Sequence, residues 1–252
     1  MDPNYARLYR DLYQKHWWWR AREEAVVTLL RRFQPPQGYG RILDAGCGDG
    51  LFFPRLAEFG EVEGLEPDAN TVNPAGPFAS RIHRGPFDES FQPAHPFGLV
   101  LMLDVLEHLA DPAQAVRRVH SLLAPGGVFI ATVPAFQSLW TTHDVVNHHF
   151  KRYTRAELLA LLSNAGFGIA TSRYWFHWTF PVKLAQRFAE KLLHPAPESP
   201  SVPPAPINRA LLALSLLEQR TLTRLNPPFG SSVMAVGIKS AAAIEAEKNV
   251  SS

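Results

Sequence analysis

Residues 41–50 have the sequence RILDAGCGDG, which joins a short apolar run, an acidic residue and three alternating glycines. Ile42 and Leu43 are typical of the end of a buried parallel strand, and a helix-like segment follows Gly50. Alternating glycines permit backbone angles closed to other residues and let a ligand lie against the main chain. We therefore expect an α/β fold with a ligand-binding loop at the carboxyl end of its first strand.

The glycine spacing distinguishes between two classes of ligand. A dinucleotide-binding loop has the pattern GxGxxG and holds a pyrophosphate at a helix N-terminus, whereas this loop has GxGxG. Asp44, just before the loop, repels phosphate and favours a cationic or amino-bearing ligand. Taken alone, the loop also fits a plain glycine turn between a strand and a helix.

A second acidic residue ends the next expected strand, at 61–66. Glu66 lies about 20 residues beyond the glycine loop, the offset at which a strand-tip carboxylate binds ribose hydroxyls. We expect this role for Glu66, and the alternative is a solvated acid at a strand end.

The composition excludes several classes of protein. A net charge of +2 in 252 residues, without a dense basic block, argues against nucleic acid as a partner. Cys47 is the single cysteine, which excludes an internal disulfide and a cysteine-rich metal site. Because no apolar leader or stretch of transmembrane length is visible, we expect a cytoplasmic protein.

The N-terminal segment is expected to form one helix over 5–33 with unusual aromatic content. Residues 17–19 are consecutive tryptophans, which spread around a helix and cannot all face one core. One or two of them should meet a ligand, another segment or a membrane interface. We expect Trp18 and Arg22 to contact substrate, with aromatic packing on the sheet as the alternative.

The most specific motif follows the expected central strand, residues 97–104. Residues 104–112 read DVLEHLADP, and LAPGG follows at 123–127. Together with the D-x-G-x-G-x-G pattern from Asp44 to Gly50, this run resembles the class I S-adenosylmethionine (SAM) methyltransferases. It is most similar to the small-molecule branch that includes the ubiquinone-pathway O-methyltransferases. The resemblance covers roughly residues 15–175 and 228–239.

This resemblance implies a Rossmann-like, doubly wound, mostly parallel seven-stranded sheet with helices on both faces. SAM would be the cofactor, the N-terminal helix (5–34) would cap its pocket, and a helical insertion would precede the last strand. Phe87 would cover the adenine ring and Asp88 would accept from its amino group, although the family's usual acid after strand three is not obvious here. The implied cofactor-binding residues are Asp44, Gly46, Cys47, Gly48, Gly50, Glu66, Pro67, Phe87, Asp88, Leu103 and Asp104.

Candidate catalytic residues come from two segments. His108 is a possible base, although a histidine packed below the pocket is the common alternative. The long segment 134–153 is expected to be a loop without regular structure, and residues 148–154, HHFKRYT, resemble a run in one branch of the family. His148 and His149 would deprotonate an acceptor hydroxyl near neutral pH. Arg152 would hold a phosphate or carboxylate, unless Arg152 and Tyr153 only fasten the loop to the sheet.

We also assign His143 to the acceptor site, with Trp18, Arg22, Arg152 and Tyr153. A metal site built from His143, Asp144, His148 and His149 matches no helical ligand spacing, so we expect no metal.

The domain organisation follows from these elements. We expect one methyltransferase domain over 1–240 and a flexible tail over 241–252. An insertion, 176–231, would hold a basic amphipathic helix and a leucine-rich helix separated by a proline-rich linker, 194–206.

Such helices lie on a membrane surface or cover a lipid-like acceptor, or else pack on the sheet or a second subunit. We therefore expect methylation of a small molecule, amphiphilic or phosphate-bearing, most simply on oxygen, with peripheral membrane contact. The alternative is a non-catalytic SAM-fold protein that docks to a membrane or a partner through 176–231.

Overall fold

A seven-stranded sheet with the order β3-β2-β1-β4-β5-β7-β6 forms the centre of the computed structural model, which describes residues 10–193, 201–222 and 225–241. The strands are β1 (Arg41–Ala45), β2 (Glu61–Glu66), β3 (Ile82–Arg84), β4 (Phe97–Leu103), β5 (Leu123–Pro134), β6 (Phe167–Trp175) and β7 (Ser232–Lys239). Strand β7 is antiparallel to β5 and β6, and the other neighbouring pairs are parallel. The predicted doubly wound, mostly parallel α/β sheet is confirmed.

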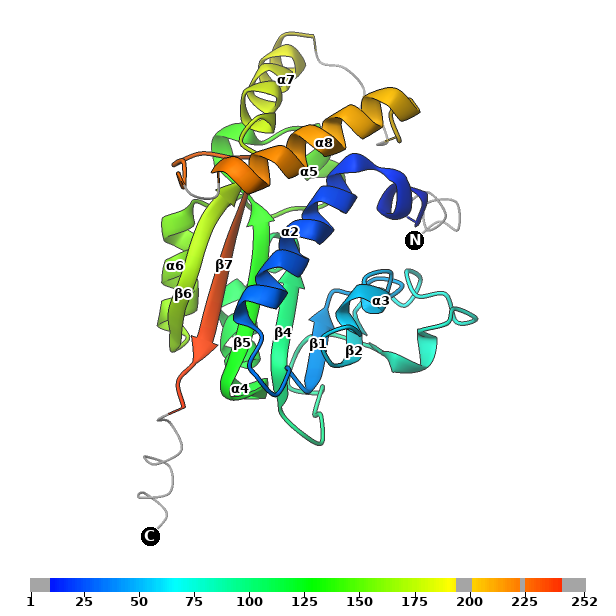
Figure 1. Cartoon of the computed structure of the whole chain (residues 1–252), viewed down its shortest axis with the longest axis vertical. Coiled ribbons are helices and arrows are strands. Elements are labelled where there is room, and N and C mark those ends of the chain that lie inside the picture. The colour runs from blue at the N-terminus through cyan, green and yellow to red at the C-terminus, as the bar shows by residue number, and fades with distance from the viewer. Residues whose placement is uncertain (1–9, 194–200, 223–224, 242–252) are drawn as a thin grey trace.

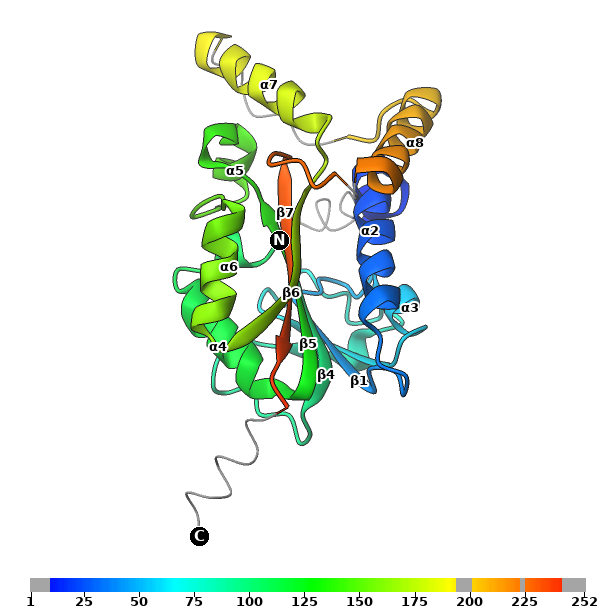
Figure 2. The same ribbon diagram turned by 60° about the vertical axis from the view of Figure 1, so that its left-hand side comes forward.

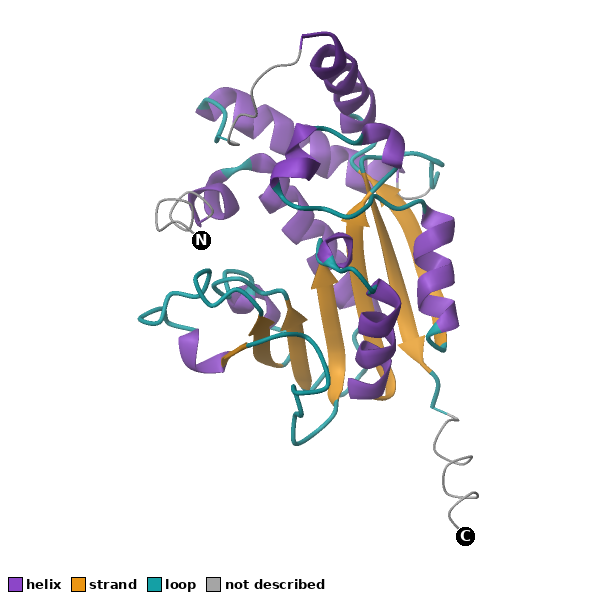
Figure 3. Ribbon diagram, turned by 180° about the vertical axis from the view of Figure 1, so that it is seen from behind, coloured by secondary structure: helices purple, strands orange, loops and turns teal. Residues whose placement is uncertain are grey.

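Helices cover both faces of this sheet (Figures 1 and 2). Helices α2 (Trp17–Phe33) and α3 (Phe53–Leu56) lie on one face, and α4 (Pro112–Leu122) and α6 (Arg155–Asn164) on the other. A separate hydrophobic cluster fills each side, and β4 contributes to both because side chains along a strand alternate between faces. Figure 3 is turned by 180° from Figure 1 and shows the face that α4 and α6 cover.

Helices α7 (Thr179–Leu193) and α8 (Ala205–Thr221) lie beyond the end of the sheet where the parallel strands finish (Figure 1). Ligands of open α/β sheets bind at that end, so both helices lie near the expected site. Among the described residues, no helix is both long and apolar enough to span a bilayer.

The N-terminal helix differs from the prediction of one helix over 5–33. Residues 10–15 are helical, but His16 is extended and its side chain accepts a hydrogen bond from the Trp18 backbone, so a new helix begins at Trp17. A side chain that caps a helix N-terminus satisfies one of its free N–H groups, which explains the break. Residues 5–9 lie outside the described part.

The segment 134–153 was wrongly predicted to lack regular structure. It contains a 3₁₀ turn, η3 (Gln137–Leu139), and a short helix, α5 (Thr142–Val146). Thr141 and Asp144 form a capping box, in which each side chain satisfies the other residue's backbone N–H. The T-x-x-D spacing of Thr141 and Asp144 is a sequence signal for a helix start, but no apolar periodicity followed it to indicate a helix.

Three other elements also have informative boundaries. The helix-like segment that follows Gly50 is reduced to α3, with turns on both sides. Strand β5 begins at Leu123 and continues through residues 125–127, with a register shift in its pairing to β4. Helix α8 already includes the end of the predicted linker, since a proline is tolerated in the first turn of a helix. Residues 194–200 and 242–252 lie outside the described part.

Helix α8 packs across α2, a contact within the chain that was not among the alternatives predicted from the sequence. The Asn208 side chain accepts from Trp17 N at 2.9 Å and donates to Lys15 O at 2.8 Å. Gln219 donates to Ala21 O at 2.9 Å. Segments almost 200 residues apart are therefore held together by side chain to backbone hydrogen bonds.

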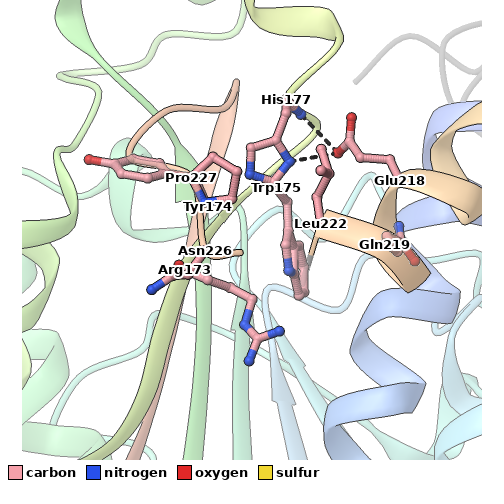
Figure 4. Close-up of a pocket in the computed structure, with 9 residues that line it drawn as sticks. All are labelled: Arg173, Tyr174, Trp175, His177, Glu218, Gln219, Leu222, Asn226 and Pro227. Carbon is pink, nitrogen blue, oxygen red and sulfur yellow. Dashed lines mark hydrogen bonds and ion pairs between the residues drawn. The ribbon is translucent and has the colours of Figure 1, made fainter. Parts of the chain in front are cut away.

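Glu218 of α8 holds the turn that follows β6. Its buried carboxylate accepts from His177 N at 2.8 Å and His177 Nδ1 at 2.9 Å (Figure 4), and from Trp178 N at 2.9 Å. Burial alone would raise the pKa of Glu218, but these hydrogen bonds outweigh it and hold the pKa below its usual value. The small pocket in Figure 4 lies between β6 and α8, away from the glycine loop.

Replacing Glu218 tests this contact. We expect Glu218→Ala to lower the free energy of unfolding by about 3 kcal/mol, since three buried donors lose a charged acceptor. Glu218→Gln keeps an acceptor oxygen and should cost less. The exposed Arg209→Ala on the same helix is the control, and urea denaturation is the measurement. Equal effects of Glu218→Ala and Arg209→Ala would contradict this account.

Candidate functional site

The glycine loop lies between the tips of β2 and β4. Gly46, Gly48 and Gly50 all have positive φ, at +80°, +56° and +70°. A Cβ on Gly46 would lie 2.5 Å from Val105 Cγ2, so only glycine fits there. Burial raises the pKa of the Cys47 thiol, whose sulfur would lie 2.3 Å from a Cβ on Gly64. Cys47 is therefore a packed thiol within the loop.

Glu66 forms the wall of the site at the tip of β2. Its carboxylate is 8% exposed and accepts from Gly48 N at 2.9 Å and from Asp68 N at 3.0 Å. Burial raises its pKa, and these two hydrogen bonds oppose that rise. The carboxylate is thus held in one orientation beside the glycine loop. Pro67 is exposed, and its contact with a cofactor stays a prediction.

Asp44 lies beneath the same loop and is 5% exposed. Burial raises its pKa to about 7, with a further contribution from the negative charge of Glu66, and Arg22 opposes the rise. A buried carboxyl with this pKa is ready to ionise when a cation arrives, because an opposite charge favours the ionised form.

Arg22 joins helix α2 to the tip of β4. Its Nε lies 2.8 Å from Asp104 Oδ2, and its Nη2 donates to Leu103 O at 2.8 Å. Asp104 has φ of +57°, a strained angle for a residue other than glycine. The Trp18 ring lies 5.5 Å from the Arg22 guanidinium carbon and stacks on Phe176, with centroids 5.7 Å apart.

Trp18 and Arg22 were predicted to contact substrate. In the structure they brace the strained end of β4, and a small pocket beside them is lined by Arg22, Phe52 and Leu103 among others. Contact with substrate stays a prediction for both.

Asp144, Arg152 and His149 form a buried charged cluster on the other side of β4. Arg152 binds Asp144 through two hydrogen bonds, Nε to Oδ1 at 2.8 Å and Nη2 to Oδ2 at 2.9 Å. His149 Nδ1 lies 2.8 Å from the same Oδ1. Burial alone would raise the pKa of Asp144, but hydrogen bonds from His149 and Arg152 outweigh it and lower the pKa well below its usual range.

This cluster changes the setting of the predicted acceptor residues. Because the Arg152 guanidinium already binds Asp144, an anion on an acceptor would have to compete with that carboxylate. The Tyr153 hydroxyl donates to Leu106 O at 3.1 Å, which fastens the loop next to β4. These contacts fit the alternative in which both residues hold the loop in place.

His108 and His149, which come from two separate sequence motifs, lie together in the structure. Their rings meet edge to face with centroids 4.6 Å apart. Partial burial lowers the pKa of His108, and His149 adds to the effect. Glu107 is buried behind them, and burial, with the charge of Asp104, raises its pKa well above the usual value.

The sequence motif did not single out Glu107. A side-chain oxygen of Glu107 and a ring nitrogen of each of these two histidines lie within 4.8 Å of one another. Of the four residues weighed for a metal from the sequence, His149 alone belongs to this group, and Asp144 is bound to Arg152.

The remaining predicted residues lie at the rim. His148 is exposed with φ of +56°. Burial, and then the charge of Lys183, lower the pKa of His143 to about 4. Exposed Asp88 accepts from Ser90 N at 2.8 Å and Ser90 Oγ at 2.6 Å, and Phe87 is half-buried. Contact of Phe87 and Asp88 with an adenine stays a prediction.

Comparisons with known proteins agree with this geometry. A family model described as a methyltransferase domain matches residues 18–172. The chain is 30% identical over 213 residues to a "probable S-adenosylmethionine-dependent methyltransferase" of Mycolicibacterium smegmatis, covering 82% of this chain and 80% of that protein. It is 31% identical to a ubiquinone biosynthesis O-methyltransferase of Azorhizobium caulinodans, covering 54% of this chain and 62% of that one.

Among solved structures, an S-adenosylmethionine-dependent methyltransferase from Mesorhizobium loti superposes with a TM-score of 0.54 at 22% identity. That match covers 85% of this chain and 98% of the other, and it supports the fold.

The buried ion pair predicts the effect of single and double substitutions. We expect Asp144→Asn to lower the free energy of unfolding by about 3 kcal/mol, because Arg152 stays buried with a weaker partner. Because the pKa of Asp144 is depressed, its contribution is present at neutral pH and disappears as acid protonates it. The double variant Asp144→Asn/Arg152→Met should be more stable than Asp144→Asn alone. Urea denaturation checks this, and additive losses would show that the two residues act independently.

Proposed function

We propose, from the premise that this chain belongs to the S-adenosylmethionine-dependent methyltransferases, that it transfers a methyl group to a hydroxyl of a small-molecule acceptor. One observation carries the residue assignments. Asp44, Glu66 and Asp104 lie at the tips of neighbouring strands around a glycine loop that leaves space for backbone contact with a ligand. Their chemistry fits a ligand with positive charge and ribose hydroxyls.

SAM has the chemical groups that these carboxylates and the glycine loop can bind. It carries an ammonium, a sulfonium and a ribose but no phosphate, so negative side chains favour it. Glu66 would accept from the ribose hydroxyls, and Asp44 would ionise beside the ammonium. The glycine loop would lie along the methionine and ribose portion, with Leu103 and Asp104 on the sulfonium side. The bound cofactor supplies an activated methyl group.

His149 is the best-placed base for an acceptor hydroxyl. Its Nδ1 lies against the Asp144 carboxylate, so a proton held there leaves Nε2 as an acceptor. As the acceptor oxygen takes the methyl group that the cofactor would supply, the hydroxyl proton would pass to His149 Nε2. His108 lies edge to face with this ring and restricts its rotation. The chain also contributes by holding both reactants in line.

Two features support an amphiphilic acceptor and O-methylation. The ubiquinone biosynthesis relatives are named as O-methyltransferases. Helix α7 also exposes Val182, Phe188, Leu192 and Leu193, with exposed fractions from 55% to 79%. Clustered exposed apolar side chains favour contact with a lipid-like molecule or surface. The same residues are the observation that favours the second candidate, a non-catalytic protein that docks through 176–231.

Calorimetric titration of SAM tests the cofactor assignments. We expect Asp44→Asn and Glu66→Gln each to weaken binding by about tenfold or more, since each removes a charged hydrogen-bond partner. Glu61→Gln, at the exposed start of β2, is the control and should bind like the unaltered protein. Loss of methyl transfer with retained binding would favour the docking alternative. Unchanged affinity in both site variants would refute these residue roles.

The raised pKa of Asp44 predicts a pH dependence of SAM binding. Below about pH 7 the carboxyl is mostly protonated and attracts the ammonium weakly, so affinity should rise between about pH 6 and pH 8. Binding below about pH 7 should also release a proton, which calorimetry detects in buffers of different ionisation enthalpy. Asp44→Asn should remove both effects. An affinity that falls with rising pH would contradict the assignment.

A further inference from the structure

Helix α7 is fastened across the segment that carries the candidate base. Arg187 Nη1 donates to Gln137 O at 3.0 Å and also binds Ser138 O. Glu190 Oε2 accepts from Thr142 N at 3.0 Å. Lys183 precedes Arg187 by four residues and Glu190 by seven, so all three share one face of the helix. That face is directed toward η3 and α5.

Lys183 differs from Arg187 in having no partner for its ammonium among the described residues. It is half-buried and, within the described part of the chain, forms no hydrogen bond or ion pair. Its ammonium interacts electrostatically with Arg152, Asp144 and Asp104, which come from three different elements around the site. Both carboxylates already have an arginine partner, because Asp144 binds Arg152 and Asp104 binds Arg22.

The neighbouring groups leave this positive charge uncompensated. Burial and the charge of Asp104 raise the pKa of Glu107 well above its usual value, and burial and Lys183 lower the pKa of His143 to about 4. Burial, followed by the charge of Arg152, lowers the pKa of Lys183 itself to about 8. Lys183 is half-buried, and a negatively charged ligand group would supply the hydrogen-bonded counter-charge that its ammonium lacks among the described residues.

We propose that Lys183 binds an oxyanion of the methyl acceptor, either a carboxylate or a phosphate, and so selects acidic acceptors. This inference rests on the proposed function, since it assigns a specificity residue to the acceptor side of the same site. It also explains why a basic residue lies on the inward face of α7, while the outward face exposes apolar side chains. Acceptor binding would then involve α7 directly.

Binding of small probes to the full-length protein loaded with S-adenosylhomocysteine tests this role. The probes are phenyl phosphate, benzoate and phenol, which share a ring and differ in the anionic group. We expect one of the two anions to bind about tenfold or more tightly than phenol, as a charged hydrogen bond contributes that much. The stronger of the two anions identifies the acceptor's acidic group as a phosphate or a carboxylate.

Three variants assign the effect to the side chain. Lys183→Met keeps the length of the stem and should lose the preference for the anion, whereas Lys183→Arg should retain it. Lys191→Met removes an exposed lysine of the same helix and should behave like the unaltered protein. Circular dichroism checks that each variant is folded.

Two results overturn the inference while the proposed function stands: no anion preference in the unaltered protein, or a preference that survives in Lys183→Met. Calorimetry with SAM distinguishes a failure of the Lys183 inference from a failure of the proposed function. Failure of SAM to bind the folded protein would overturn the proposed function and this inference together.

Discussion

Three carboxyl groups at the tips of neighbouring parallel strands impose the central electrostatic constraint on this structure. Like charges at one sheet edge repel each other, and each group is accommodated differently. Asp44 responds through a raised pKa, Glu66 accepts two backbone N–H groups, and Asp104 pairs with Arg22. A cationic cofactor would supply the counter-charge, because it favours the ionised form of Asp44, which has no hydrogen bond or ion pair among the described residues.

The position of Arg22 links this edge to distant parts of the chain. Arg22 is held by α2, whose first turn packs on the turn after β6 through Trp17 and Trp18. Glu218 of α8 holds that turn by three hydrogen bonds. The segment before the last strand thus contacts α2 through α8 and the segment 137–142 through α7. A substitution in α8 should therefore alter the position of Arg22 at the tip of β4.

The sequence contained the local part of this arrangement. Asp44 and Glu66 were assigned from a glycine spacing and a strand-tip offset, which are short-range patterns that fix where a side chain lies in an α/β sheet. The pairing of Arg22 with Asp104 was not visible, because helix α2 and strand β4 are brought together only by tertiary packing. Arg152 was predicted either to hold an acceptor anion or to fasten its loop, and its buried partner Asp144 was not visible in the sequence. Lys183 belongs to the predicted basic amphipathic helix, and only the position of α7 in the structure directs it toward η3 and α5.

The most direct test of the central claim is a crystal structure of the protein with S-adenosylhomocysteine. The account predicts that the ribose hydroxyls lie on the Glu66 carboxylate and that the homocysteine follows the glycine loop from Gly46 to Gly50. The sulfur should face the side of β4 where His149 and Lys183 lie. A ligand bound elsewhere, or one whose sulfur faces away from His149, would contradict it.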